Sequence, residues 1–132
     1  MAFSHAQHAG RRDISCTYCH QTVETTAHAG IPTTETCMEC HRVVSPNHPE
    51  VQKVANAFQE GRAIDWVRVT NLPEFVRFSH HPHIRAGVDC RSCHGDVAGM
   101  ERVYQAHRLS MGECLSCHNQ RNAPTDCYTC HF

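Results

Sequence analysis

Length, composition and charge limit what this chain can be. It has 132 residues, 40% of them hydrophobic, and a formal net charge of −1 at pH 7, so its length fits a single domain. There is no uninterrupted apolar run of about 18 residues or more, and the sequence therefore predicts no membrane span. The near-neutral charge also argues against a nucleic-acid surface.

All ten cysteines fall into five copies of one motif, Cys-x-x-Cys-His. This motif is the attachment signature of c-type haem, in which two thiols bond to the porphyrin and the histidine becomes the proximal iron ligand. A disulfide framework would not need the histidines, and paired zinc knuckles would occur in even number or use separate histidines. We therefore predict five covalent haems c. The attachment residues are Cys16, Cys19, Cys37, Cys40, Cys90, Cys93, Cys114, Cys117, Cys127 and Cys130, and the proximal ligands are His20, His41, His94, His118 and His131.

A second pattern precedes the first and third motifs. Phe3-Ser4-His5-Ala6-Gln7-His8 matches Phe78-Ser79-His80-His81-Pro82-His83. Two histidines three residues apart, on one helical turn or a tight bend, can point at two different irons. The repeat predicts two di-haem modules, residues 1–44 and 76–120, and a fifth haem in residues 121–132.

Residues 45–75 form a connector without cysteine. Pro49 suits the first position of a helix that begins near Asn47 or His48. Val51, Val54, Ala55 and Phe58 recur at helical spacing, and Gly61 predicts the end. The next stretch, Ile64–Val69, is rich in strand formers and holds the only tryptophan. We interpret the connector as a cover for haem edges, with a partner-docking surface as the alternative.

Eight histidines lie outside the motifs, whereas five irons need five distal ligands. We predict that the two His-x-x-His pairs supply four of them, His5, His8, His80 and His83. The last haem must borrow its ligand, because no histidine lies between His118 and Cys127, and each pair would therefore serve its own module's haem and a neighbouring one. The candidates for the fifth distal ligand are His28, His107 and Met111. Of these, Met111 would raise the haem potential. We expect His48 and His81 to be surface or propionate-contacting residues.

The expected fold is mainly α with much irregular chain. A mean hydropathy of −0.49 leaves the polypeptide with little core of its own, whereas porphyrin faces would bury much apolar area. We expect residues 1–132 to form one small multihaem cytochrome c domain wrapped around a haem stack. Eleven arginines stand against the single Lys53, and arginine pairs well with carboxylates such as haem propionates.

These patterns resemble known families. The Phe-Ser-His-x-x-His run before a haem motif resembles the class III multihaem cytochromes c. That resemblance implies that His5 serves the Cys16 haem and His80 the Cys90 haem, while His8 and His83 serve other haems. Three further stretches resemble the pentahaem subunit of alternative complex III, a bacterial quinol-oxidising membrane assembly. They are His28–Pro32, Trp66–Phe75 and Leu109–Cys114. The chain lacks the N-terminal membrane anchor of that subunit, so a soluble relative is an alternative.

The sequence favours electron transfer over catalysis, because every motif carries a histidine and the distal candidates outnumber the irons. A multihaem reductase, which needs one open iron, is one alternative. A polymeric filament that exchanges a ligand between copies is another. We expect redox-protein donors and acceptors, no enzymatic activity, and a periplasmic or extracellular location, since haem c is attached outside the bacterial cytoplasm. A leader would then have been cleaved or lie outside this numbering.

Overall fold

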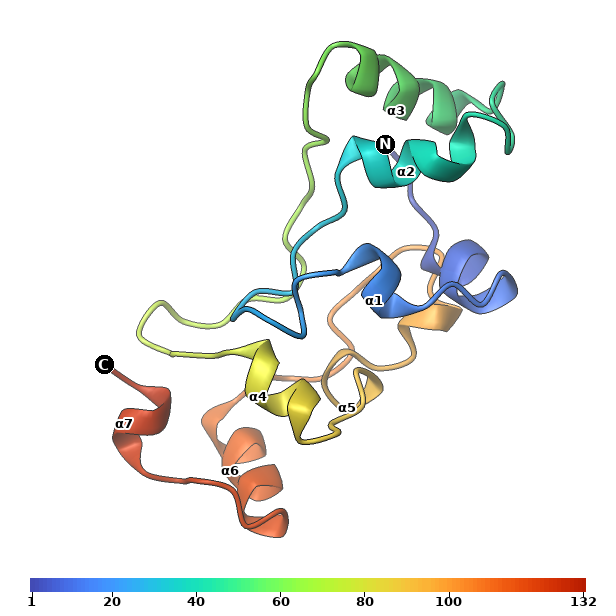
Figure 1. The fold of residues 1–132 in the computed structure, drawn as a ribbon. Helices are drawn as coiled ribbons and strands as arrows, with labels where there is room; N and C mark the ends of the chain where they lie inside the picture. The colour runs from blue at the N-terminus through green and yellow to red at the C-terminus, as the bar shows by residue number, and fades with distance from the viewer.

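A computed structural model describes residues 1–132. Seven α-helices, one π-helical segment and one 3-10 segment follow one another along an open, irregular chain (Figure 1). In chain order they are η1 (Ala6–Arg11), α1 (Cys16–Cys19), α2 (Thr34–His41), α3 (Pro49–Gln59), α4 (His80–Arg85), α5 (Arg91–His94), η2 (Val97–Gly99), α6 (Met111–Gln120) and α7 (Cys127–Cys130). No β-sheet forms, and the single antiparallel bridge, Val76 with His131, is isolated. The prediction of short helices joined by irregular chain is confirmed.

Each Cys-x-x-Cys-His motif lies on, or at the edge of, its own helix: α1, α2, α5, α6 and α7. Residues three apart on a helix share one face, so both cysteines of a motif can reach the same group. In three motifs the proximal histidine closes the turn. His20 N–H bonds to Cys16 O, His94 N–H to Cys90 O and His131 N–H to Cys127 O, each at 2.9 Å.

The connector contains the longest helix, α3, which begins and ends as its sequence predicts. His48 is the N-cap, its side chain accepts from Glu50 N–H at 3.3 Å, and Pro49 follows at the first position. Gly61 then adopts φ +63°, a left-handed conformation that favours glycine. The apolar face packs on α2. Val51 and Val54 are buried as their spacing suggests, and Ala57, at 0% exposure, is the third buried residue of the helix.

The strand formers Ile64–Val69 make no strand. They run as irregular chain, and Ile64–Trp66 line a hollow together with residues 31–35. Trp66 meets the Phe3 ring edge-on, with centroids 6.0 Å apart. Strand propensity describes a fit to a pleated surface, and the fold places no neighbouring strand beside this segment.

The polypeptide buries little of its own surface. Seven of 132 residues are buried, and most of them belong to the α2–α3 pair. The 14.9 kDa chain exposes 9612 Å², whereas a folded monomer of that mass exposes about 7,000 Å². The helices therefore pack less closely against one another than those of an ordinary folded monomer of this mass. None of them combines the length and apolar character of a membrane-crossing segment.

Candidate haem-binding sites

None of the ten cysteines is paired in a disulfide. Burial is the main cause that raises the pKa values of five of them: Cys19, Cys37, Cys90, Cys93 and Cys114. Thiols of other motifs add to the effect, because Cys40 lies near Cys19, Cys16 near Cys90 and Cys117 near Cys93. The motifs therefore sit close together, with their thiols partly shielded from water.

Most of the motif histidines and the distal candidates form a hydrogen bond between one ring nitrogen, Nδ1, and a backbone carbonyl. Among proximal histidines, the Nδ1–oxygen distances are 2.7 Å for His20 to Gly30, 2.9 Å for His41 to Val44, 2.5 Å for His118 to Pro124 and 3.2 Å for His131 to Phe75. Among distal candidates they are 2.8 Å for His8 to Ser4, 2.9 Å for His80 to Ala27 and 2.7 Å for His83 to Ser79. An Nδ1–H that donates to a carbonyl leaves Nε2 free to bind a metal.

The two His-x-x-His pairs place three of their rings opposite proximal histidines. The ring centroids of His80 and His94 are 6.2 Å apart and the planes differ by 9°. His83 lies 6.0 Å from His118, and His8 lies 6.0 Å from His41. Two metal–nitrogen bonds of about 2 Å, plus about 1 Å from each nitrogen to its ring centre, place two axial imidazoles about 6 Å apart. These three pairs therefore have the spacing of bis-histidine iron sites.

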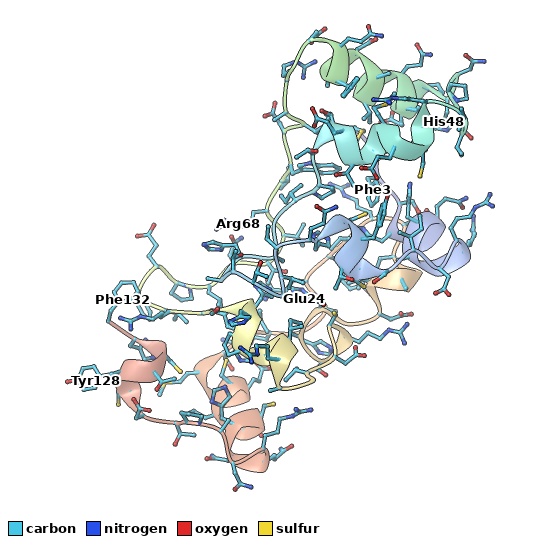
Figure 2. The ribbon with its side chains drawn as sticks, viewed as in Figure 1. Phe3, Glu24, His48, Arg68, Tyr128 and Phe132 are labelled. Carbon is cyan, nitrogen blue, oxygen red and sulfur yellow. The ribbon has the colours of Figure 1, made fainter.

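His5 differs from the other distal candidates. Its Nδ1 is buried and has no hydrogen-bond partner. Burial lowers the pKa of His5, and the nearby His20 and His8 lower it further. The neutral ring favoured there is the form that coordinates iron. Phe3 orders this region, because its ring is edge-on to His5 at 4.9 Å and stacked on His8 at 4.5 Å; Figure 2 shows it between α2 and the first haem motif.

The fifth proximal histidine, His131, has no histidine ring paired with it at such a distance. Its aromatic neighbour is Phe75, stacked at 5.9 Å. Of the three candidates for the fifth distal ligand, His28 is exposed in the loop after α1, and Met111 is 62% exposed at the start of α6. The Nε2 of His107 lies beside Gly95, 3.8 Å from where a β-carbon would stand.

The arginines pair with several different groups. Arg11, Arg62 and Arg91 form exposed ion pairs with Glu101, Glu60 and Asp96. Arg42 lies over the Phe58 ring and Arg77 over the Phe132 ring, 5.4 and 5.2 Å from the ring centres. Their suggested role as propionate partners stays a prediction.

Sequence reasoning did not find the acceptors that orient the rings. The carbonyls of Gly30, Val44 and Pro124 belong to residues with no side-chain signal for this role, and Ala27 accepts from His80 across 53 positions.

Sequence reasoning also missed a contact between the first and second motifs, in which the Tyr18 hydroxyl donates to the Glu39 carboxylate. That bond is the main cause that raises the pKa of Tyr18 to about 12.

The donor set fits haem c. It combines paired thiols on single helical turns with rings whose Nε2 is free and whose centroids stand about 6 Å apart.

The family described as cytochrome c7 and related cytochrome c matches residues 76–132. Over 156 aligned residues the chain is also 29% identical to the "Menaquinone reductase, multiheme cytochrome c subunit" of Nitratidesulfovibrio vulgaris. That alignment covers 98% of this chain and 74% of the relative.

Both comparisons support the prediction of a class III type of multihaem cytochrome c that carries haem and takes part in electron transport. They do not extend to alternative complex III, so the likeness to its pentahaem subunit remains a prediction. The number of haems and their ligands also remain predictions.

Proposed function

We propose that this chain is an electron carrier that holds five covalent haems c and relays electrons between redox protein partners. The observation that carries the proposal is the set of three histidine ring pairs at about 6 Å, each made of a motif histidine and a member of a His-x-x-His pair. An iron held between two imidazoles has no position left for a substrate. Such a site suits electron transfer rather than chemistry on a bound molecule.

The residues have separable roles in this proposal. The ten cysteines anchor the haems, and the carbonyl acceptors fix the tautomer and orientation of the ring that each one holds. The haems supply one-electron redox chemistry when bound. A relay needs its ligands to stay in place as charge changes, and hydrogen bonds to backbone carbonyls in the loops restrain the rings in that way.

The distal ligands follow the same logic. We propose His80 for the Cys90 haem, His83 for the Cys114 haem, His8 for the Cys37 haem and His5 for the Cys16 haem. The fifth haem takes His28, His107 or Met111.

The proposed setting is a quinone-linked respiratory complex outside the cytoplasmic membrane. The relative in N. vulgaris is named as a subunit of a menaquinone reductase, and the sequence resembles the pentahaem subunit of alternative complex III. Both point to a chain that exchanges electrons with a neighbouring subunit of a membrane assembly. The natural partners are then redox proteins.

The matured protein tests this proposal directly. Intact mass should exceed the bare polypeptide by five haems, and the reduced protein should bind almost no carbon monoxide at neutral pH, because a proposed distal ligand occupies the second axial position of every haem. It should exchange electrons quickly with redox dyes without turning over nitrite, hydroxylamine or sulfite. One carbon monoxide bound per protein, together with steady reduction of any of these substrates, would instead establish an enzyme.

A further inference from the structure

The first and second motifs are neighbours in space. The short segment η1 carries the ring of His8 to His41 of the second motif, while His5, one turn earlier, lies near His20 of the first. The Tyr18 hydroxyl of the first motif donates to Glu39 of the second. Two separate contacts therefore join these motifs.

The first motif also meets the third, although residues 21–89 lie between them in the chain. The His20 ring of the first motif lies near the His94 ring of the third, so the motif histidines of both face the same region. The Cys16 side chain of the first motif also lies close to that of Cys90 in the third.

Reciprocal backbone contacts hold this junction together. In one direction, η1 packs on η2, which follows the third motif, and Ala6 N–H donates to Met100 O at 2.9 Å. In the other direction, both the backbone N–H and Nδ1 of His80 bond to Ala27 O, which follows the first motif, at 3.0 and 2.9 Å. Each module thus ties its His-x-x-His segment to the other module.

The contacts continue toward the C-terminus. Helix α4 presents His80 to the third motif and His83 to the fourth. The fifth motif adjoins the chain that leads into α4, because Arg77 N–H donates to Cys130 O at 2.7 Å and Phe75 O meets the His131 ring. Figure 1 shows the same succession of helices, from α2 through α1 and α5 to α6 and α7.

We infer that the haem sites follow the order second, first, third, fourth, fifth in space, so that electrons cross between the two modules through the first and third haems. This inference rests on the proposed electron-carrier function. The second and fifth sites are then the two ends of the relay. The second is backed by α3, whereas at the fifth Tyr128 projects outward with 84% of its surface exposed (Figure 2).

Iron positions in crystals of the matured protein, located by anomalous diffraction, test this order without any substitution. We expect the second-motif iron to have the first-motif iron as its one close neighbour, and the third-motif iron to lie between the first and the fourth. A second-motif iron nearest to the third, as in sequence order, would overturn the inference. The electron-carrier proposal would survive that result, because it depends on axial ligation and not on order.

Magnetic relaxation provides a second test in solution. H8A should make the second-motif haem high-spin and broaden the haem methyl resonances of the first-motif haem alone. H5A should broaden those of both the second and the third. H81A is the matched control and should broaden none. Equal broadening of the first and third haems by H8A would contradict the order, and if a variant fails to mature, the iron positions in the unsubstituted protein decide.

Discussion

At the scale of single residues, α4 offers a controlled comparison of three adjacent histidines. His80 and His83 lie about one imidazole–metal–imidazole span from His94 and His118, and each bonds through Nδ1 to a backbone carbonyl. His81 is on the same helix but has no such ring partner. Position on the helix, rather than residue type, therefore distinguishes the proposed ligands His80 and His83 from His81, which is not proposed as a ligand.

Replacing each of the three by alanine exploits this contrast. H80A and H83A should each convert one haem of five to a high-spin form, visible as a new electron paramagnetic resonance signal and a shifted Soret band. H81A should leave both spectra unchanged. A high-spin signal from H81A, or none from the other two, would show that the pairing is wrong.

The buried, unpartnered Nδ1 of His5 leads to a prediction about reduction potential. A carbonyl acceptor at Nδ1 makes an imidazole a stronger donor, which stabilises ferric iron and lowers the potential. His8 has such an acceptor and His5 has none. We therefore expect the haem that His5 serves to have a more positive potential than the haem that His8 serves.

Redox titrations of the H5A and H8A variants assign the two potentials. Each variant should lose one wave from the low-spin set of the unsubstituted protein. The wave lost in H5A should lie at the more positive potential. The opposite ranking would mean that solvent exposure or propionate charge outweighs the hydrogen bond.

At the scale of elements, α6 shows how local sequence stabilises a motif-bearing helix. Ser110 and Glu113 form a capping box, in which Glu113 N–H donates to Ser110 Oγ at 3.4 Å and Ser110 N–H donates to the Glu113 carboxylate at 2.9 Å. Ser110 Oγ also donates to that carboxylate, at 2.8 Å. The two bonds that the carboxylate accepts, the backbone one first, lower the pKa of Glu113. The box orders the helix that carries Cys114, Cys117 and His118.

S110A should therefore lower the free energy of unfolding by about 1 kcal/mol at neutral pH. Because the folded-state pKa of Glu113 is lowered, its contribution is present above the unfolded pKa and is lost as pH falls through the folded value. The difference between variant and unsubstituted protein should thus shrink in acid, as measured by denaturant titration of the Soret band. S116A, in the middle of the same helix, is the control and should cost less; an equal cost at both positions would argue against the capping box.

At the scale of the whole molecule, the junction between the modules depends on close approach at Gly10. A β-carbon there would stand 2.4 Å from the backbone oxygen of Ala98, so one of the two segments would have to move. Gly112 has no such neighbour, since a β-carbon would meet only Ser110 Oγ at 4.0 Å. The two glycines form a matched pair for testing the junction.

G10A should lower the free energy of unfolding by about 1–3 kcal/mol, as overpacking generally does. It should also change the magnetic interaction between the first and third haems. G112A should leave both unchanged or slightly raise stability, because alanine favours a helix. If G10A behaved like G112A in denaturation and in resonance spectra, the packing of η1 on η2 would not hold the junction.

The sequence by itself determined the motifs and the local structure around them. A motif that spans one helical turn needs no tertiary context, so the short helices that carry the cysteines could be predicted from spacing. The helix α3 could be predicted in the same way, because Pro49 and Gly61 act through their own backbone preferences. The strand formers Ile64–Val69 show the limit of such propensities, since a strand exists only where the fold supplies a partner.

Only the tertiary structure decided which ring faces which, and which backbone carbonyl holds each ring. Ala27 accepts from His80, and Gly10 approaches Ala98, across intervals that no local pattern encodes. The succession of motifs in space departs from their order in the chain for the same reason. Each His-x-x-His segment is anchored on the other module, and such long-range contacts depend on the path of the whole chain and not on spacing within a motif.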